Sequence, residues 1–256
     1  MPRILLLSIL LLAACQQSAP AEFAPSACET KHFEGSGFVA CAVEGGAVEL
    51  HTFDKAGAPM RSFSNLQASL GKRAPNVAFA MNAGMFDDEG RPIGLLIEGG
   101  EQKHAINLRK GGGNFHLLPN GVFLVRKSGK AEVVPSTAYE PSKDIAFATQ
   151  SGPMLLIDGK LHPKFDQDGP SQNIRNGVGI APDGTAVFVI SQDPVSFGRF
   201  ARFFRDRVRA RNALYFDGVV SSLWDPAGHR MDSHTEIGPM AVVFVAPRPA
   251  SARRKQ

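Results

Sequence analysis

The chain has 256 residues, of which 43% are hydrophobic and 20% are charged, and its formal net charge is +4. This composition is typical of a globular protein, excludes an intrinsically disordered chain, and allows one core that buries about 70% of the unfolded surface. No apolar run approaches the roughly 20 residues that a membrane-spanning helix requires.

The first 14 residues have the pattern of a secretion signal. A positive start with Arg3 is followed by the apolar run 4–12, and small residues then precede Cys15. The segment Leu12-Ala13-Ala14-Cys15 resembles the lipobox of bacterial lipoproteins. It predicts removal of residues 1–14 and lipidation of Cys15, with more than one acyl chain for stable anchoring in the membrane.

The next residues are polar and rich in Ala and Pro, so residues 15–27 are predicted to form a flexible tether. Gln16 stands where other lipoproteins that remain in the inner membrane have Asp, and this resemblance favours the outer membrane. The expected location is therefore the periplasmic side of a bacterial cell envelope. Nucleic acid is not an expected partner there, and the oligomeric state is left open.

Two cysteines remain after Cys15, namely Cys28 and Cys41. An even number of cysteines in an oxidising compartment favours a disulfide. It would close a loop of about a dozen residues and stabilise the fold by about 3 kcal/mol. Two buried thiols are the alternative.

Residues 28–246 are predicted to form one α+β domain, with mostly strands in a twisted mixed sheet and one or two covering helices. Hairpins are expected over 38–53, turning at Glu44-Gly45-Gly46, and over 114–125, turning at Pro119-Asn120-Gly121. A short helix is expected over 64–71. Further strands are expected at 76–81, 93–98, 145–149, 154–157, 177–180, 186–190, 213–216 and 241–245. Tight turns are expected at Asp158-Gly159 and at Asp183-Gly184, the latter between the strands 177–180 and 186–190.

The strongest helix signal begins after Ser196, which is a suitable N-cap. Apolar residues from Phe200 to Val208 follow helical spacing, and Asn212 is expected to end the helix in a left-handed conformation. Six arginines and one aspartate lie between 199 and 211. They predict either a solvated helix face or a contact with phosphate-rich partners such as anionic lipid or lipopolysaccharide. The basic residues 247–256 are expected to be a disordered tail.

Four strands are predicted to end in glycine-containing turns, each presenting a polar side chain. Glycine in such a turn lets a ligand approach the backbone closely. Any one of these turns alone is explained as well by a purely structural role. The segments are Asn82-Ala-Gly-Met-Phe86, Ser151-Gly-Pro-Met-Leu155, Arg175-Asn-Gly-Val-Gly179 and Phe216-Asp-Gly-Val-Val-Ser-Ser222.

In this order, and together with Pro92-Ile-Gly-Leu-Leu-Ile-Glu98 and the block 113–123, these segments resemble the phosphodiester glycosidase family. The resemblance covers residues 28–245. It implies a hydrolase that cleaves a sugar-1-phosphodiester in envelope or scavenged glycans. The sequence departs from the family pattern at Val219 and Val220, which stand where glycines are common and predict a stiffer loop.

The implied chemistry requires a cation for the phosphodiester and a carboxylate for glycosyl cleavage. A guanidinium suits the first, and Arg175 is the candidate. Asp217 is the leading catalytic carboxylate, with Glu98 or Asp193 as its partner. A phosphate leaving group needs little protonation, so the second acid is dispensable.

Further substrate contacts are expected from Asn82, Gly84, Gly152, Gly218 and Ser221. No cofactor is expected and no zinc signature is present in the sequence, although a divalent cation bridging phosphate and Asp217 is compatible with it. Trp224 either stacks on a sugar or packs in the core. The nearby acidic and histidine residues are interpreted as a surface loop: Asp225, His229, Asp232, His234 and Glu236.

Two rival functions remain. One is a non-catalytic envelope lipoprotein that binds glycan or lipopolysaccharide on the same scaffold. The other is a phosphodiesterase that cleaves the P–O bond in place of the C–O bond. Convergence of Asn82, Arg175 and Asp217 in one pocket would favour catalysis.

Overall fold

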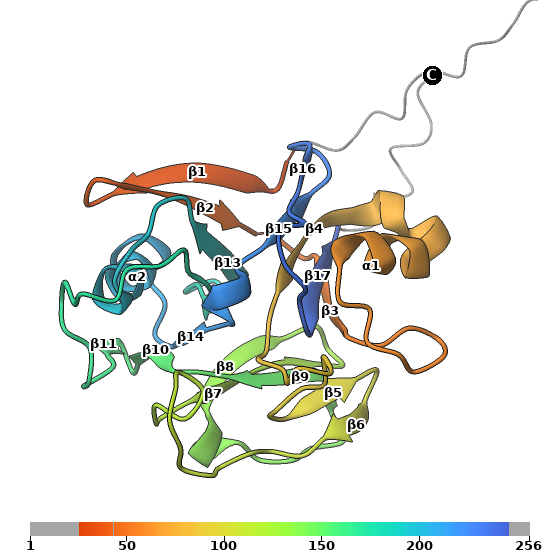
Figure 1. The fold of residues 1–256 in the computed structure, drawn as a ribbon, viewed down its shortest axis with the longest axis horizontal. Coiled ribbons are helices and arrows are strands. Elements are labelled where there is room, and N and C mark those ends of the chain that lie inside the picture. The colour runs from red at the N-terminus through yellow and green to blue at the C-terminus, as the bar shows by residue number, and fades with distance from the viewer. Residues whose placement is uncertain (1–25, 43, 246–256) are drawn as a thin grey trace, which may run out of the picture.

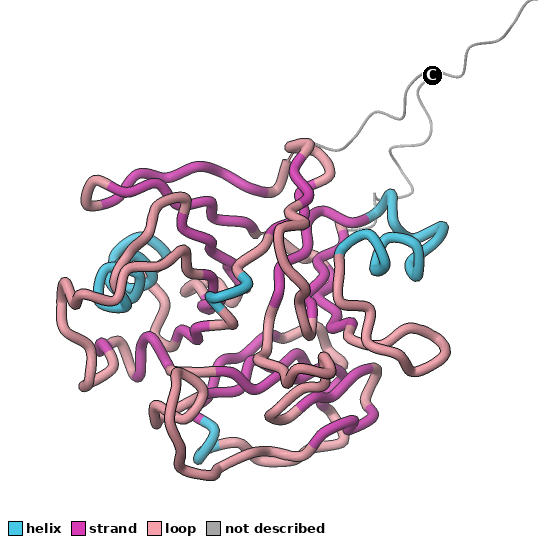
Figure 2. Tube along the Cα trace, viewed as in Figure 1, coloured by secondary structure: helices cyan, strands magenta, loops and turns pink. Residues whose placement is uncertain are grey.

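The computed structural model describes residues 26–42 and 44–245. Three sheets surround a common core, with helix α2 on the outside of one sheet and helix α1 on the outside of another (Figures 1 and 2). The predicted α+β class is confirmed. The single mixed sheet expected within that class is instead three sheets, in which every pairing between described strands is antiparallel.

The largest sheet has seven strands and carries α2 on its outer face. Its hairpin around Asp183-Gly184 and the tight turn at Asp158-Gly159 were both predicted correctly. In spatial order its strands are β1 (Cys28–Phe33), β2 (Ser36–Cys41), β13 (Ala186–Ser191), β12 (Asn176–Ile180), β14 (Ala213–Tyr215), β10 (Met154–Ile157) and β11 (Lys160–Leu161).

The other two sheets have five strands each. One contains β16 (Arg230–Met231), β15 (Leu223–Asp225), β4 (Val77–Asn82), β17 (Met240–Phe244) and β3 (Ala47–His51). The other contains β6 (Glu101–His104), β5 (Leu96–Glu98), β9 (Ile145–Ser151), β7 (Gly121–Arg126) and β8 (Ala131–Pro135). Short helical turns are η1 (Gly71–Asn76), η2 (Ser136–Ala138), η3 (Phe204–Val208) and η4 (Gly218–Val220).

Both early hairpins were predicted wrongly. β2 pairs with β1 and β13, whereas β3 pairs with β17 in a different sheet. The glycines at 45 and 46 therefore connect two sheets. Residues 114–118 form no strand, and β7 pairs with β8 and β9. Alternating apolar residues on both sides of a turn predict strands but not which strands they pair with.

The core lies where the three sheets face one another. Phe79 from β4, Phe123 from β7 and Phe188 from β13 belong to one buried cluster, and the Phe188 ring contacts each of the other two edge to face. Residues alternate along β17: Ala241 and Val243 point into this cluster, while the residues between them pack under α1. The period of two explains how a strand buries both faces.

Helix α1 (Phe63–Leu70) lies within one residue of its predicted bounds. Ser62 caps it by accepting a hydrogen bond from the Asn65 N–H, and Gly71 ends it with φ +53°. Phe63, Leu66 and Leu70 are buried against the sheet. Trp224 is 3% exposed in the same cluster, so it packs in the core and is not available to stack on a sugar.

Helix α2 (Phe197–Phe203) begins as predicted, because the Ser196 hydroxyl accepts a hydrogen bond from the Arg199 N–H. Phe200 and Phe203 pack against Phe38 of β2. The expected end at Asn212 is wrong: the helix continues as a π-helical turn, η3, and ends at Arg209 with φ +61°.

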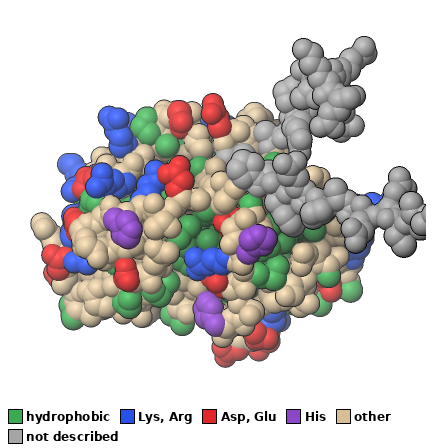
Figure 3. Space-filling view, turned by 90° about the horizontal axis from the view of Figure 1, so that it is seen from above, with side chains coloured by type: hydrophobic (Ala, Val, Ile, Leu, Met, Phe, Trp, Pro, Cys, Tyr) green, Lys and Arg blue, Asp and Glu red, His purple; other side chains and the backbone are tan. Residues whose placement is uncertain are grey.

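The arginines of α2 and η3 are interspersed with acidic side chains. Figure 3 shows blue and red side chains intermixed at the end of the molecule that carries β1 and α2. Arg202 lies 2.6 Å from Glu34 and 3.0 Å from Asp168. Further ion pairs join Arg199 to Glu34, Arg205 to Asp206 and Arg211 to Asp158. This pairing supports the interpretation of a solvated face over that of a polyanion site.

The disulfide predicted between Cys28 and Cys41 is confirmed. The two residues are opposite one another on β1 and β2. Cys15, the signal, the basic tail and most of the tether lie outside the described residues. Within the described part of the chain, no helix has the length and apolar character needed to cross a bilayer.

Candidate functional site

A pocket of about 560 Å³ lies between the ends of three central strands of the seven-stranded sheet and the β15–β16 hairpin. The start of β12 and the ends of β13 and β14 meet there, since β12 is antiparallel to both neighbours. The volume is in the range of small-molecule sites. The lining residues are Asn173, Ile174, Ser191, Gln192, Gly218, Val219, Ser221, Arg230, Asp232 and His234.

Buried amide side chains join the two sheets behind this pocket. Asn82, at the end of β4, donates from Nδ2 to the backbone carbonyl of Asp217 at 2.8 Å. Its Oδ1 accepts from the Ser222 N–H and from Asn176 Nδ2, each at 2.8 Å. The Asp217 N–H donates to the Ala83 carbonyl at 3.1 Å. The N–H and the carbonyl of Asp217 are therefore both hydrogen-bonded to residues at the end of β4.

The Asp217 carboxyl group is half-buried next to the pocket wall formed by Gly218 and Val219. Burial raises its pKa, and a hydrogen bond from the Val219 N–H partly opposes this shift. A carboxylate with a raised pKa is a stronger base at neutral pH. The turn contact also matches the structural role that Asp often has before Gly.

Gly218 is required by the close approach of Tyr215. A Cβ at this position would overlap the Tyr215 hydroxyl. That hydroxyl accepts from the Gly218 N–H and from Arg175 Nη1, the latter at 3.3 Å. Burial raises the pKa of Tyr215, and the Asp217 charge adds to the shift. Asp217, Tyr215 and Arg175 thus form a row that leads from the pocket wall into the interior.

Each nitrogen of the Arg175 guanidinium donates to an acceptor of its own chain. The residue is 1% exposed and does not line the pocket. Nε donates to the Val195 carbonyl at 2.8 Å, and Nη2 donates to the Ser171 carbonyl at 2.9 Å. The ring of Phe197 lies 3.6 Å from Cζ. Burial lowers the pKa of this guanidinium. The geometry is that of a structural cation.

The two alternative partner carboxylates lie elsewhere. Glu98 is half-buried beside His51 and Thr52, and this partial burial raises its pKa. His51 pairs with Met240, and Met240 pairs with Asn82. His51, the neighbour of Glu98, is therefore separated from Asn82 by two strand spacings of about 5 Å each. Asp193 is exposed, and its Oδ2 accepts from the Gly37 N–H at 2.7 Å. The structure brings neither carboxylate into the pocket lining.

The remaining predicted contacts divide into two groups. Ser221 lines the pocket, and its Oγ donates to the Gly218 carbonyl at 3.0 Å. Gly84 and Gly152 are close-packed instead: a Cβ would meet Thr149 at the first and Asn120 at the second. These two glycines allow loops to pack, and neither lines the pocket.

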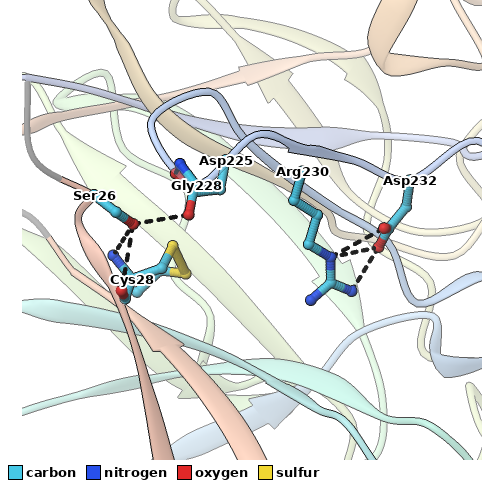
Figure 4. The surroundings of a disulfide bond; sticks show 7 residues. Ser26, Cys28, Asp225, Gly228, Arg230 and Asp232 are labelled. Carbon is cyan, nitrogen blue, oxygen red and sulfur yellow. Dashed lines mark hydrogen bonds and ion pairs between the residues drawn. A yellow bond between two sulfur atoms is a disulfide. The ribbon is translucent and has the colours of Figure 1, made fainter. Parts of the chain in front are cut away.

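Three further lining residues were not predicted as site residues: Asp232 and His234 were interpreted as parts of a surface loop, and Arg230 was not singled out. Arg230 and Asp232 come from the β15–β16 hairpin, and His234 follows it. Arg230 donates to Asp232 from Nε at 3.0 Å and from Nη2 at 2.7 Å (Figure 4). The spacing Arg230-x-Asp232 was a usable signal, because residues i and i+2 of an extended segment lie on the same face.

No group of three or more His, Cys, Asp or Glu side chains among the described residues has the geometry to hold a metal ion. Asp225, interpreted as part of a surface loop, is instead a buried strand residue whose Oδ1 accepts from the Gly228 N–H at 3.0 Å. This hydrogen bond lies within the tight turn that connects β15 and β16. The cation bridge at Asp217 stays a prediction.

Among solved structures, the catalytic domain of zebrafish N-acetylglucosamine-1-phosphodiester alpha-N-acetylglucosaminidase, auto-inhibited by its pro-peptide, is similar in fold. The match has a TM-score of 0.60 and 15% identity, covering 90% of this chain and 87% of that one. A hypothetical protein from Synechocystis matches with a TM-score of 0.54 and 14% identity, over 86% of this chain and 61% of that one. A putative exported protein from Burkholderia pseudomallei matches with a TM-score of 0.51 and 12% identity, over 82% and 74%.

Among curated proteins, the uncharacterized protein YigE of Escherichia coli (strain K12) is 43% identical over 152 residues. The match spans 59% of each chain, so this chain covers less than two thirds of that relative. The family model described as phosphodiester glycosidase matches residues 75–240. That range includes Asn82, Asp217 and the whole β15–β16 hairpin. The chain therefore belongs to the phosphodiester glycosidase family.

Proposed function

We propose that this protein hydrolyses a sugar-1-phosphodiester in the pocket between Gly218 and the β15–β16 hairpin. The observation that carries the proposal is the Asp217 turn, which is held on both peptide groups by the end of β4. A reactive carboxylate must be fixed to within a fraction of an ångström of its working position. The zebrafish protein of similar fold is an N-acetylglucosamine-1-phosphodiester alpha-N-acetylglucosaminidase.

In this proposal, Asp217 acts as a general base. It takes a proton from water, the water oxygen bonds to the anomeric carbon, and the C–O bond to phosphate breaks. The electron pair leaves with the phosphate oxygen, which is a good leaving group without protonation. The products are a sugar with a free anomeric hydroxyl and a phosphomonoester. Ser221, in the pocket wall, is placed to hydrogen-bond the substrate.

The cellular setting belongs to the same proposal. We infer that Cys15 carries the lipid anchor and that the domain works on the periplasmic side of the envelope, at the outer membrane. The substrate would then be a glycan phosphodiester of the envelope, or one scavenged from outside. The Cys28–Cys41 disulfide is compatible with that oxidising compartment.

The test is sugar release from a panel of sugar-1-phosphodiesters by the purified chain. Asp217→Asn should abolish turnover. Asp183→Asn is a matched control, because Asp183 also precedes Gly in a turn and accepts from a backbone N–H, that of Thr185. Full activity of Asp217→Asn would exclude the catalytic role of Asp217.

A second experiment distinguishes the rival functions. Hydrolysis in oxygen-18 water puts the label in the sugar for C–O cleavage and in the phosphate for P–O cleavage. Saturable binding with no turnover would instead support a non-catalytic glycan-binding lipoprotein.

A further inference from the structure

The Arg230–Asp232 pair is held rigidly in the wall of the pocket. Asp232 Oδ2 accepts from the Leu223 N–H at 2.9 Å, and the Asp232 N–H donates to the Leu223 carbonyl at 3.1 Å. Leu223 belongs to β15, whose next residue, Trp224, is buried in the core. The carboxylate that contacts Arg230 is therefore fixed to the body of the protein.

Asp232 contacts only one edge of the Arg230 guanidinium. Its two oxygens receive the Nε and Nη2 donors, and Figure 4 shows the Nη1 atom on the other side of the group. A guanidinium has five N–H donors in a planar fork. The Nη1 and Nη2 end remains for a second planar pair of oxygens, such as the two unesterified oxygens of a phosphodiester.

The carboxyl groups around the pocket outnumber its one arginine. Arg230 is the one arginine or lysine in its lining, and Asp232 lies beside it. Asp217, which precedes Gly218 in the chain, adds a second carboxyl group. The hydrogen bonds of the Arg230 fork are open to either anion, but two carboxyl groups outweigh one cation, and the resulting negative potential repels a doubly charged anion about twice as strongly as a singly charged one.

We propose that Arg230 and Asp232 together form a phosphate site that accepts a singly charged phosphodiester and disfavours a doubly charged phosphomonoester. Asp232 has two effects: it orients the guanidinium, and its charge repels the dianion. Arg230 thereby takes the role that the sequence suggested for Arg175. This inference rests on the proposed function, and it adds a reason for product release. Hydrolysis converts the bound monoanion into a monoester that loses a second proton above about pH 6.

The test measures binding, so that it is independent of turnover. Dimethyl phosphate has one negative charge at pH 8 and methyl phosphate has two. Their dissociation constants are measured by NMR titration of the purified chain at that one pH. Wild type should bind dimethyl phosphate at least about fivefold more tightly than methyl phosphate. This is the factor expected when a carboxylate in contact with water repels one additional negative charge on the ligand.

Asp232→Asn keeps an oxygen for the Leu223 N–H but removes the charge, and it should cancel or reverse this ratio. A purely structural effect would weaken both anions equally. Arg230→Lys should weaken dimethyl phosphate at least about tenfold, because it keeps the charge and loses the fork. The proposal is overturned by tighter binding of methyl phosphate to wild type, by an unchanged ratio in Asp232→Asn, by unchanged binding in Arg230→Lys, or by no binding of dimethyl phosphate. Each outcome is independent of whether sugar is released.

Discussion

The side-chain amide of Asn82 donates a hydrogen bond to the backbone carbonyl of Asp217 at 2.8 Å. Asn82 ends β4 in one sheet, and Asp217 follows β14 in another. A side chain from one sheet thus sets the position of a turn that belongs to a second sheet. The proposed catalytic carboxyl group depends on this contact for its placement next to the pocket wall that Gly218 and Val219 form.

Asn82→Ala should therefore lower both stability and activity. It leaves the Asp217 carbonyl and the Ser222 N–H without their partner, at a cost of about 2–3 kcal/mol in the free energy of unfolding. Urea unfolding measures the first effect, and kcat for sugar release measures the second. Asn65→Ala is a matched control, because Asn65 Nδ2 also donates to a backbone carbonyl, that of Met60 at 2.7 Å in the region of α1. It should lose about 1 kcal/mol and keep full activity.

Asp217→Asn should inactivate the protein without destabilising it at neutral pH. Burial raises the pKa of Asp217 above its ordinary value of 3.8, so the ionised group opposes folding. This penalty is fully present above the folded-state pKa, decreases as the pH falls through that pKa, and is absent below the unfolded-state value. The variant should be more stable than wild type at pH 7, with the difference vanishing near pH 3. Urea unfolding of both proteins from pH 3 to 8 checks the sign. A variant that loses stability at pH 7 would contradict it.

The sequence was most informative where a strand ends in a turn of fixed chemistry. Ser196 identified the start of α2, and Asp183-Gly184 identified the β12–β13 hairpin, because cap and turn preferences are local. The same reasoning failed at Gly45-Gly46, where the chain crosses between sheets. Which sheet a strand joins depends on contacts that are distant in sequence.

The candidate site was predictable in part for the same reason. The turn motifs identified Asn82, Asp217 and Ser221, which the structure brings together. They also suggested Arg175, whose guanidinium is buried away from the pocket. A motif shows that a side chain is needed, but not which way it points. The spacing of Arg230 and Asp232 puts both on one face of an extended segment, but only the fold brings that face to the pocket that Gly218 also lines.

Arg175→Lys should affect stability and leave phosphate binding intact. Lysine cannot reproduce the donations to Val195, Ser171 and Tyr215, so we expect a loss of about 2–4 kcal/mol in unfolding free energy. Dimethyl phosphate should bind as it does to wild type under conditions where the variant is folded. Arg230→Lys should give the opposite pattern. Loss of binding in a stable Arg175→Lys protein would restore the role that the sequence suggested.

Removal of the disulfide should destabilise the domain by about 2–4 kcal/mol. Cys28 and Cys41 are 13 residues apart and join the first two strands at the edge of the seven-stranded sheet. The variant with serine at both positions should have a lower urea midpoint than oxidised wild type, and its midpoint should not respond to reductant. Wild type should lose a similar amount on reduction. Mass spectrometry after alkylation without reduction should find both cysteines unmodified; two alkylated thiols would exclude the bridge.

Gly218→Ala should be destabilising, and a change at Tyr215 should rescue it. The new methyl group would overlap the Tyr215 hydroxyl, which is held by Arg175 and by the Gly218 N–H. Overpacking of this kind costs about 1–3 kcal/mol. Tyr215→Phe removes the oxygen, so the double variant should recover part of the loss relative to the sum of the single changes. Urea unfolding of the four proteins gives the coupling energy. If the two effects simply add, the hydroxyl is not what excludes a side chain at 218, and the row from Asp217 to Arg175 does not set the geometry of the turn.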